Sequence, residues 1–243
     1  MHYVRFFLLL VLLINVSCDQ NSDQEISLDA VDRLKKGNSR FLQNTSRYPN
    51  RNEDRIRSLK DKRKPFAVVV TASNANVIPE IIFDQGFGDL FVMRTAGSFL
   101  CKSQMDTVRY GVTQFSPSMI LILAHGNSDL LKTVIKGKTK HIPIIEKNIR
   151  PSIQTAKKQG DSDLLVSSMQ QHTLAIADKV MADPVIKKKV DQKTLLLQLA
   201  YYNMDEGTIE FWDYVTLRKQ FPIPEKPAVP TKKTSSTTRT TSL

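Results

Sequence analysis

The segment His125-Gly-Asn-Ser-Asp129 follows an apolar run and holds three side chains that could take part in chemistry. An imidazole can bind a metal ion or accept a proton, and a neighbouring serine hydroxyl can act as a nucleophile. Asp129 would share a face with His125 if helical geometry already held there. The segment therefore suggests either a metal site of His125, Asp129 and water, or a Ser128 nucleophile with His125 as its base.

Each of these chemical interpretations has a structural alternative. His125 can be a neutral histidine that is hydrogen-bonded at the end of a strand, and Asp129 can be a helix-start carboxylate favoured by the helix dipole. No oxyanion-hole motif stands near Ser128, and sequence proximity to His125 alone is weak evidence for a nucleophile and base. We favour the structural alternatives for His125 and Asp129, and the evidence for a Ser128 nucleophile is weak.

The remaining histidines and cysteines add no cluster of metal ligands. The chain has two cysteines, Cys18 and Cys101, and His141 and His172 have no ligand-like neighbours in the sequence. We expect both histidines at the surface or on helix flanks. If Cys18 is modified, Cys101 has no partner for a disulfide, and we expect it to pack as a small apolar side chain near a loop.

The N-terminus has the pattern of an export signal. Arg5 supplies a positive charge, and an unbroken apolar run from Phe6 to Ile14 follows it. This run is too short to span a bilayer, so residues 1–18 are predicted to be a cleaved signal peptide. The sequence Asn15-Val-Ser-Cys18 resembles a bacterial lipoprotein cleavage site, although Asn15 replaces the usual apolar residue. We expect lipidation at Cys18 and a lipid-anchored protein of the bacterial cell envelope; an ordinary signal peptide that is cut nearby is the alternative.

The composition is strongly basic. The chain has 243 residues, with 35 Lys and Arg against 24 Asp and Glu, which gives a formal net charge of +11. Such a surface attracts anionic lipid headgroups or nucleic acid without specificity. No nucleic-acid-binding motif accompanies the charge, and export would separate the protein from nucleic acid, so we expect none as a partner.

Short apolar runs alternate with helical patterns along the middle of the chain. The runs at residues 66–71, 90–93 and 119–124 are typical of parallel strands that are buried on both faces. Residues 105–115 and 129–135 between and after them have helical spacing. This alternation predicts an α/β fold whose central sheet is mainly parallel and flanked by helices.

The two ends of the domain have patterns of their own. Residues 28–42 predict an amphipathic helix, residues 47–64 a charged loop or short helix, and residues 163–182 a helix with an apolar stripe. A strand at 194–202 turns at Asn203-Met-Asp-Glu-Gly207 into 208–211, which predicts a C-terminal hairpin. We expect a tether at 19–27, one domain at 28–218, and a disordered tail at 219–243.

Several separated motifs resemble the β-class carbonic anhydrases. Residues 69–80 and 84–97 resemble the first half of that family, including Arg94-Thr-Ala-Gly97. Arg33-Leu-Lys-Lys-Gly-Asn-Ser-Arg-Phe41 resembles its N-terminal helix, and Ile120-Leu-Ile-Leu-Ala-His125 resembles the strand before its second metal motif. Residues 183–186 and 201–211 resemble its C-terminal helix and hairpin. The resemblance covers roughly residues 28–214 and implies the fold and homodimer of that family.

The same resemblance implies a zinc site whose ligands are mostly absent. Family members hold zinc through two cysteines and one histidine, and these positions fall on Ala72, Ser128 and His125. An Asp and an Arg that control access to the metal-bound water fall on Asn74 and Asn76. A methyl group cannot coordinate a metal, and a serine hydroxyl stays neutral near pH 7. We therefore expect no zinc cofactor and no metal-bound hydroxide to attack CO2.

These observations leave three functional hypotheses. The leading one is a non-catalytic homologue that acts as a membrane-anchored binding or assembly protein, as a homodimer with an unknown small ligand or protein partner. The second is an active carbonic anhydrase, that is a carbonate dehydratase, or another lyase that uses an altered metal site. The third is a membrane-surface binding module driven by the basic charge.

Overall fold

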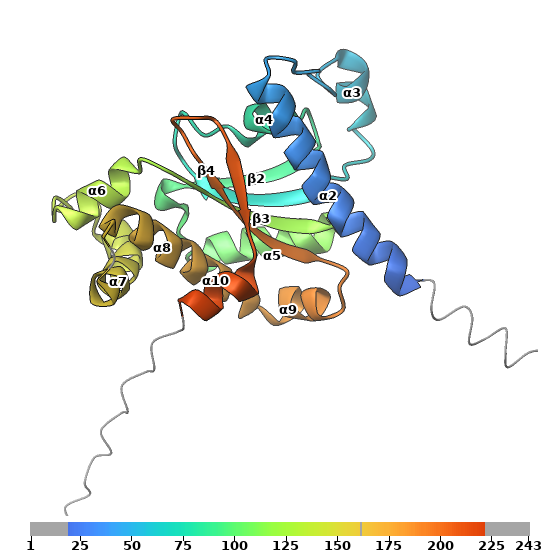
Figure 1. The fold of residues 1–243 in the computed structure, drawn as a ribbon. Helices are drawn as coiled ribbons and strands as arrows, with labels where there is room; N and C mark the ends of the chain where they lie inside the picture. The colour runs from blue at the N-terminus through green and yellow to red at the C-terminus, as the bar shows by residue number, and fades with distance from the viewer. Residues whose placement is uncertain (1–18, 161, 222–243) are drawn as a thin grey trace, which may run out of the picture.

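The structure of the chain is a computed structural model that describes residues 19–160 and 162–221, with side chains described from residue 29 onward. The predicted signal peptide, Cys18 and most of the predicted tail lie outside this part of the chain. Figure 1 shows a central sheet with helices on both faces. The predicted α/β class is confirmed.

Five strands form one sheet in the order β2-β1-β3-β4-β5. Their bounds are Ala67–Ala72 for β1, Leu90–Thr95 for β2, Met119–His125 for β3, Leu196–Tyr202 for β4 and Ile209–Trp212 for β5. The first four strands run parallel, and β5 returns antiparallel to β4, which confirms the predicted hairpin. Every residue of β1 is buried, because helices cover the sheet on both sides.

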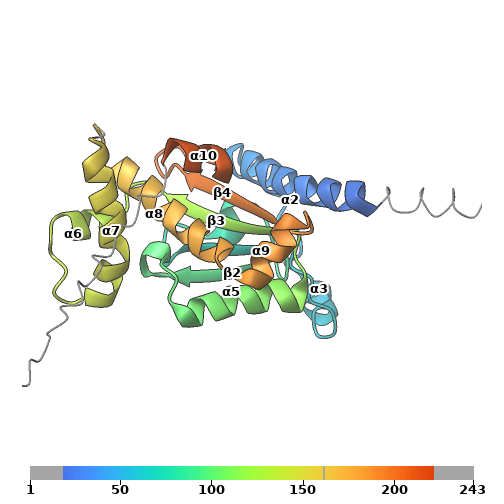
Figure 2. The same cartoon turned by 90° about the horizontal axis from the view of Figure 1, so that it is seen from below.

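The helices form two layers. Helices α2 (Asp19–Leu42), α3 (Glu53–Ser58) and α4 (Pro79–Ile82) lie on one side of the sheet or beside it. Figure 2 shows α5, α8 and α9 across the other face, with α6 and α7 at one end. The bounds of the later helices are Lys102–Phe115 for α5, Asp129–Ile135 for α6, Pro143–Gln159 for α7, Leu164–Met181 for α8, Pro184–Asp191 for α9 and Tyr214–Gln220 for α10.

Alternate residues of each central strand enter two separate cores. Val68, Val70, Ile120 and Ile122 pack with buried side chains of α5, α8 and α9. Their neighbours Val69 and Leu121 face the opposite core, which includes Leu34 of α2. This alternation explains the continuous apolar runs in the sequence, since both faces of each strand are buried.

The parallel strands bring their carboxyl ends to one edge of the sheet. In the sheet register Ala72 lies beside Thr95, and His125 lies beside Tyr202. Open α/β sheets bind ligands outside the carboxyl ends of their strands. The chemically interesting residues of the sequence therefore meet at the edge where a site is expected.

The N-terminal helix begins earlier than predicted. α2 starts at Asp19, so residues 19–27, which were expected to be a tether, are helical. At the other end, α10 continues to Gln220, so the first two residues of the predicted tail, Lys219 and Gln220, form the end of a helix. Within residues 19–160 and 162–221, none of the helices combines the length and the hydropathy that a transmembrane span requires.

The prediction for Cys101 was wrong. Its side chain is exposed, and it caps the N-terminus of α5 instead of packing in an apolar environment. The thiol sulfur lies 3.2 Å from the Ser103 hydroxyl and also contacts the Gln104 side chain. The hydrogen bond with Ser103, followed by the Gln104 backbone N–H, lowers the pKa of the Cys101 thiol.

Cys101 should therefore react faster with a disulfide reagent than an ordinary exposed cysteine near neutral pH. Replacing Ser103→Ala removes the leading cause, so the pH midpoint of the reaction should rise and the rate at pH 7 should fall severalfold. The measurement is the pH profile of thiol release, with Thr107→Ala on the same helix as the control. An unchanged midpoint in Ser103→Ala would contradict this account.

Candidate functional site

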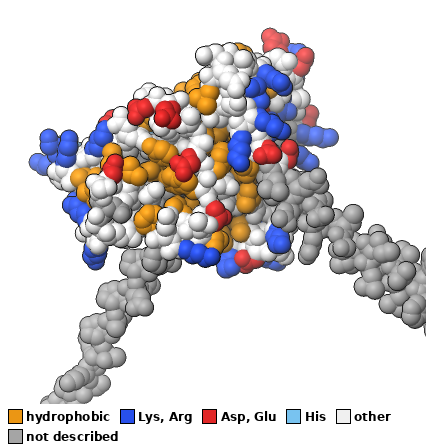
Figure 3. Space-filling model, viewed as in Figure 1, with side chains coloured by type: hydrophobic (Ala, Val, Ile, Leu, Met, Phe, Trp, Pro, Cys, Tyr) orange, Lys and Arg blue, Asp and Glu red, His pale blue; other side chains and the backbone are white. Residues whose placement is uncertain are grey.

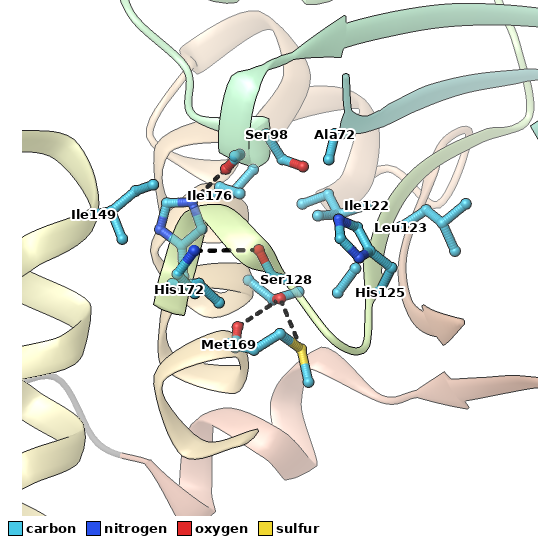
Figure 4. A pocket seen from close by; sticks show the side chains of 14 residues that line it. Ala72, Ser98, Ile122, Leu123, His125, Ser128, Ile149, Met169, His172 and Ile176 are labelled. Atoms are coloured by element: carbon cyan, nitrogen blue, oxygen red, sulfur yellow. Dashed lines mark hydrogen bonds between the residues drawn. The ribbon is translucent and has the colours of Figure 1, made fainter. Parts of the chain in front are cut away.

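A cavity of about 30 Å³ lies at the carboxyl edge of the sheet. Its wall includes the end of β1 at Ala72, the end of β3 at His125, and Ser128 at the start of α6. Helices α7 and α8 contribute Ile149, Met169, His172, Thr173 and Ile176. Figure 4 shows the imidazoles of His125 and His172 on opposite sides of the cavity in this view. The sheet thus brings together the three positions that the resemblance assigns to zinc ligands.

His125 is a buried histidine at the end of β3. Its Nδ1 lies 2.8 Å from the carbonyl oxygen of Gly126, and a carbonyl can only accept, so Nδ1 carries the proton. Burial lowers the pKa of His125, and the Gly126 hydrogen bond and the charge of Asp129 offset this only in part. The position at the strand end and the hydrogen bond to Gly126 are those of the structural alternative for His125. Its other nitrogen, Nε2, is left as an acceptor with no hydrogen-bonding partner among the described residues.

Ser128 has a structural task. It is the N-cap of α6, and its hydroxyl oxygen accepts the backbone N–H of Leu131 at 3.3 Å. Serine is a favoured N-cap because its oxygen satisfies one of the free N–H groups in the first turn. The structure shows no hydrogen bond from Ser128 to His125 in the described chain, so a nucleophile and base pair gains no support.

Asp129 does not converge on the cavity with His125. Its side chain is 96% exposed and lies 3.7 Å from the ammonium group of Lys132. The helix begins at Asp129, so residue 125 still belongs to β3 and the helical spacing between the two does not apply. The carboxylate sits in the first turn of α6, where the helix dipole favours it.

The positions of the family's Asp and Arg lie in the loop after β1, and neither lines the cavity. The side-chain oxygen of Asn74 accepts the backbone N–H of Asn76 at 2.9 Å, which closes a local turn. The Arg94 guanidinium donates to the Asn74 carbonyl oxygen at 2.6 Å and braces the loop from β2. Asn76 is exposed and Asn74 is half-buried. The two asparagines therefore shape the loop instead of placing charge beside the cavity.

His172 is the cavity residue that the sequence analysis missed. The expectation that it lies at the surface or on a helix flank was wrong, because it is 8% exposed and faces the interior from α8. Its Nε2 donates to the Gly97 carbonyl oxygen at 2.7 Å, and its Nδ1 is buried with no partner among the described residues. His141, by contrast, is exposed as expected.

The spacing of α8 contained the signal for His172. It lies three residues after Met169 and four before Ile176, both of which are buried. Residues at these intervals share one helix face. The spacing of His172 to Met169 and Ile176 therefore predicts that it is buried on the apolar stripe of α8.

Burial also lowers the pKa of His172, with a further contribution from the charge of Lys179. Because the unfolded chain takes up this proton first as pH falls below about 6.5, the folded state loses stability in that range. For one fully shifted group the slope reaches about 1.4 kcal/mol per pH unit. The free energy of unfolding, measured with urea, should therefore fall as the pH is lowered from about 7 to about 5 and approach this slope at the acid end. His125 adds to the fall with the same sign.

The His172→Gln variant should remove one histidine's share of this pH dependence, because glutamine does not titrate. Exposed His141 gives the matched control, since His141→Gln should leave the slope unchanged. Asp84 and Asp183 have lowered pKa values, so their protonation reduces the free energy of unfolding only at lower pH. Their contribution can therefore be separated from that of the histidines. A wild-type slope in His172→Gln would rule out His172 as the source.

Comparison with known proteins identifies the family of the chain. The family model for carbonic anhydrase matches residues 67–209, which is more than half of the chain and includes the cavity strands β1 and β3. The chain belongs to the β-class carbonic anhydrase family. A carbonic anhydrase of Mycolicibacterium smegmatis is 29% identical over 184 residues, which cover 73% of this chain and 89% of that protein.

Solved β-carbonic anhydrases share the fold. The β-carbonic anhydrase CcaA superposes with a TM-score of 0.62 at 19% identity, covering 76% of this chain and 96% of that one. One of two tetrameric β-carbonic anhydrases of Sordaria macrospora superposes with a TM-score of 0.54 at 14% identity, covering 64% and 84%. These likenesses place the predicted parallel sheet and its hairpin in the architecture of the family.

Zinc is the metal normally used by this family, and the cavity residues do not suit it. Of the three positions, Ala72 offers only a methyl group, and the neutral Ser128 hydroxyl already caps a helix. Among the described residues, no group of three or more His, Cys, Asp or Glu is placed to hold a metal ion. His125 Nε2 is the one suitable donor at these positions, and a single imidazole is a weak zinc site.

Proposed function

We propose that this protein is a carbonic anhydrase homologue that does not hydrate CO2 and acts as a membrane-anchored binding or assembly protein. The observation that supports it is the lining of the cavity: a methyl group, a capping hydroxyl and one free ring nitrogen stand at the three positions. Without bound zinc, nothing lowers the pKa of a water molecule from about 16 to about 7, so the hydroxide nucleophile is missing.

The direct test is metal analysis of the purified protein together with stopped-flow CO2 hydration. We expect less than stoichiometric zinc and a hydration rate equal to that of buffer, even after incubation with zinc and removal of the excess. The carbonic anhydrase of Mycolicibacterium smegmatis, prepared in the same way, serves as the positive control. One zinc per chain with hydration activity would refute the proposal.

A second candidate function is favoured by one observation. His172 brings a second imidazole to the cavity wall, which an altered metal site could use together with His125. In this alternative the protein is an active carbonate dehydratase or another lyase. Two imidazoles without thiolates bind zinc less tightly than the family's donor set, so we rank it second. Metal-dependent hydration that is lost in His172→Gln would support it.

We also propose that the protein forms a homodimer or a larger homo-oligomer. A structural neighbour from Sordaria macrospora is described as tetrameric. Figure 3 shows apolar side chains along the middle of one face, where Figure 1 places the β4–β5 hairpin. Exposed apolar residues of α8 and α10 include Val166 and Val215. Native mass spectrometry should give an even number of subunits, and a monomer at micromolar concentration would contradict this.

The membrane anchor rests on the sequence of the N-terminus. We propose that Cys18 carries the lipid and places the protein in the bacterial cell envelope, with α2 starting at the next residue. Labelling of cells with an alkyne fatty acid should mark the wild-type protein and leave Cys18→Ser unlabelled. Cys101→Ser is the matched control and should stay labelled. Equal labelling of the Cys18→Ser variant would exclude Cys18 as the lipidated residue.

A further inference from the structure

Four cationic side chains border a second pocket, of about 300 Å³, which shares no lining residue with the cavity at the carboxyl edge of the sheet. Three of them, Arg33, Lys36 and Arg40, lie at intervals of three and four residues on α2, so they share one face of that helix. The fourth is Arg47, in the segment that follows α2. Its backbone N–H and the Arg40 guanidinium donate to the same carboxylate, of Asp84, at 3.0 and 2.6 Å, which holds Arg47 beside the end of α2.

Two of these cations are held in place by buried carboxylates. Arg33 donates through Nε to the Gln85 side chain at 3.0 Å, and its Nη2 lies 3.0 Å from the Asp89 carboxylate. Arg40 donates through Nε to Asp84. Nη1 of Arg33 and both Nη groups of Arg40 have no hydrogen bond among the residues that the structure describes. A planar guanidinium that is already fixed loses little further entropy when it binds an anion, so these N–H groups are preoriented donors.

The positive charge of the pocket is only partly compensated. In the described part of the chain, neither the Lys36 ammonium nor the Arg47 guanidinium has an ion-pair partner. Lys36 lies three residues after Arg33 and four before Arg40, and like charges at these intervals destabilise a helix. Asp29 is the one carboxylate among the residues that line the pocket. A bound anion with more than one negative charge would relieve this repulsion.

The size and the walls limit the kind of anion. About 10–15 Å³ of such space holds one water molecule, so a pocket of about 300 Å³ admits a phosphate group with a small organic part. Guanidinium groups bind phosphate oxygens through paired N–H donors, and a phosphate monoester carries nearly two negative charges above about pH 7. Besides the four cations, the walls are Asp29, Pro49 and Gln85, so no aromatic side chain offers a surface on which a nucleobase would stack.

We propose that this pocket binds phosphate monoesters of small polar molecules, such as polyol or sugar phosphates, with Lys36 and Arg47 as the cations that contribute most. Arg33 and Arg40 add N–H donors whose positions are fixed. Such a phosphate group can come from two sources, a soluble ester or the headgroup of a phosphatidic acid. Since no residue lines both the pocket and the cavity, the site does not depend on whether the cavity binds zinc.

Glycerol 3-phosphate and glycerate are a matched pair of probes, because they differ mainly in whether the anionic group is a phosphate or a carboxylate. The purified full chain is titrated with each by calorimetry, at about pH 8 and an ionic strength of about 0.1 M. We expect saturable binding of glycerol 3-phosphate with a dissociation constant of about 1 mM or lower, and binding of glycerate that is at least about tenfold weaker.

Dihexanoyl phosphatidic acid, kept below its micelle concentration, distinguishes the two sources of the phosphate group. It presents the same phosphate monoester with two short acyl chains attached. Pro49 is the one apolar residue among those that line the pocket, so we expect the acyl chains to add little. Affinity equal to that of glycerol 3-phosphate identifies a soluble ester as the ligand, and much tighter binding identifies a lipid headgroup.

Lys36→Gln and Arg47→Gln test the two cations that have no ion-pair partner. Both side chains are exposed, and Arg47→Gln keeps the backbone N–H that binds Asp84, so thermal unfolding should show that both variants fold. Each should weaken the binding of glycerol 3-phosphate severalfold, and the double variant should show no saturable binding. Asp29→Asn should bind severalfold more tightly, because it removes the one negative charge of the lining. Lys157→Gln removes a positive charge from the exposed surface of α7, at the other end of the domain (Figure 2), and should bind like the wild type.

The outcomes separate this inference from the proposed function. A folded wild-type protein that binds neither phosphate probe saturably overturns the inference, and so does binding that Lys36→Gln and Arg47→Gln leave unchanged. Glycerate binding as tight as that of glycerol 3-phosphate contradicts the preference for phosphate. An equal loss of affinity in Lys157→Gln would assign the effect to net charge and overturn the pocket as the site. None of these results bears on CO2 hydration, and zinc with hydration activity would defeat the proposed function while leaving this site in place.

Discussion

Replacing Ala72 and Ser128 together by cysteine is expected to turn the cavity into a zinc site that retains about one metal ion per chain. Both positions line the cavity next to His125, so the double variant presents two thiolates and one imidazole. This donor set is typical of zinc in proteins. Zinc binds small cysteine-containing peptides with about 10–16 kcal/mol, so even an imperfect geometry should keep the metal through gel filtration. The wild-type protein should not retain it.

Metal analysis after gel filtration measures the result, and cobalt substitution gives a visible thiolate absorption that reports the ligands. Each single variant is a control and should bind much more weakly, since it has only two donors. Ser128→Cys also weakens the cap of α6, by about 1 kcal/mol, so its unfolding should be followed with and without zinc. Adding His125→Asn to the double variant should lower the affinity again. No metal in the double variant would mean that the three positions do not converge as the family requires.

The sheet could be predicted from the sequence because its signals are local. The continuous apolar runs of β1 and β3 reflect burial on both faces, and the boundaries of α6 and α8 follow from the capping residues Ser128 and Asp163. Each of these signals lies within one element and needs no knowledge of its neighbours. The parallel order followed from their alternation with helices.

Helix α7 was not predicted, and its sequence explains why. Pro151 lies inside it, and proline removes a backbone hydrogen bond and disfavours a helix interior. The helix forms because Ile149, Ile153 and Ala156 are buried at helical spacing against α6 and α8. The end of α10 was missed for a similar reason, since Arg218 and Tyr214 both contact Asp178 of α8. Such helices are stabilised by tertiary packing, so their local sequence alone does not predict them.

The candidate site was predictable in its strand residues and not in its helical ones. Ala72 and His125 are the last residues of β1 and β3, and Ser128 follows β3 by three residues, so the parallel pairing of the two strands brings the three positions together. The spacing of α8 predicts that Met169 and His172 are buried, but only the way that α8 crosses the sheet brings them to the cavity. The exposed position of Asp129 likewise depends on how the first turn of α6 lies against the rest of the domain. The positions of the helices therefore decide which of the predicted chemical roles the cavity residues can take.

Replacing Asp84 by alanine is expected to lower the free energy of unfolding by about 3 kcal/mol or more. Its carboxylate is fully buried and accepts N–H groups from Arg40, Arg47 and Tyr48 at 2.6, 3.0 and 3.0 Å. Burial alone would raise the pKa of Asp84, but these donors outweigh it and hold the pKa below its usual value. Without the carboxylate, the partly buried guanidinium of Arg40 and two backbone N–H groups lose their partner.

This one carboxylate joins α2 to the segment after α4, where the two approach so closely that a side chain at Gly37 would collide with the Phe83 carbonyl. Loss of the ion pair should therefore loosen α2 from the domain. The melting temperature should drop by about 6 to 12 °C for a chain of this size. Asp54→Ala is the matched control, because its pair with Arg57 is exposed on both sides and exposed pairs add little. Equal melting temperatures for Asp84→Ala and Asp54→Ala would show that the buried pair does not hold α2.

The melting temperature of Asp84→Asn should fall between those of the two alanine variants. Asparagine tolerates the positive φ of 46° and keeps one acceptor, but it loses the charge that Arg40 needs.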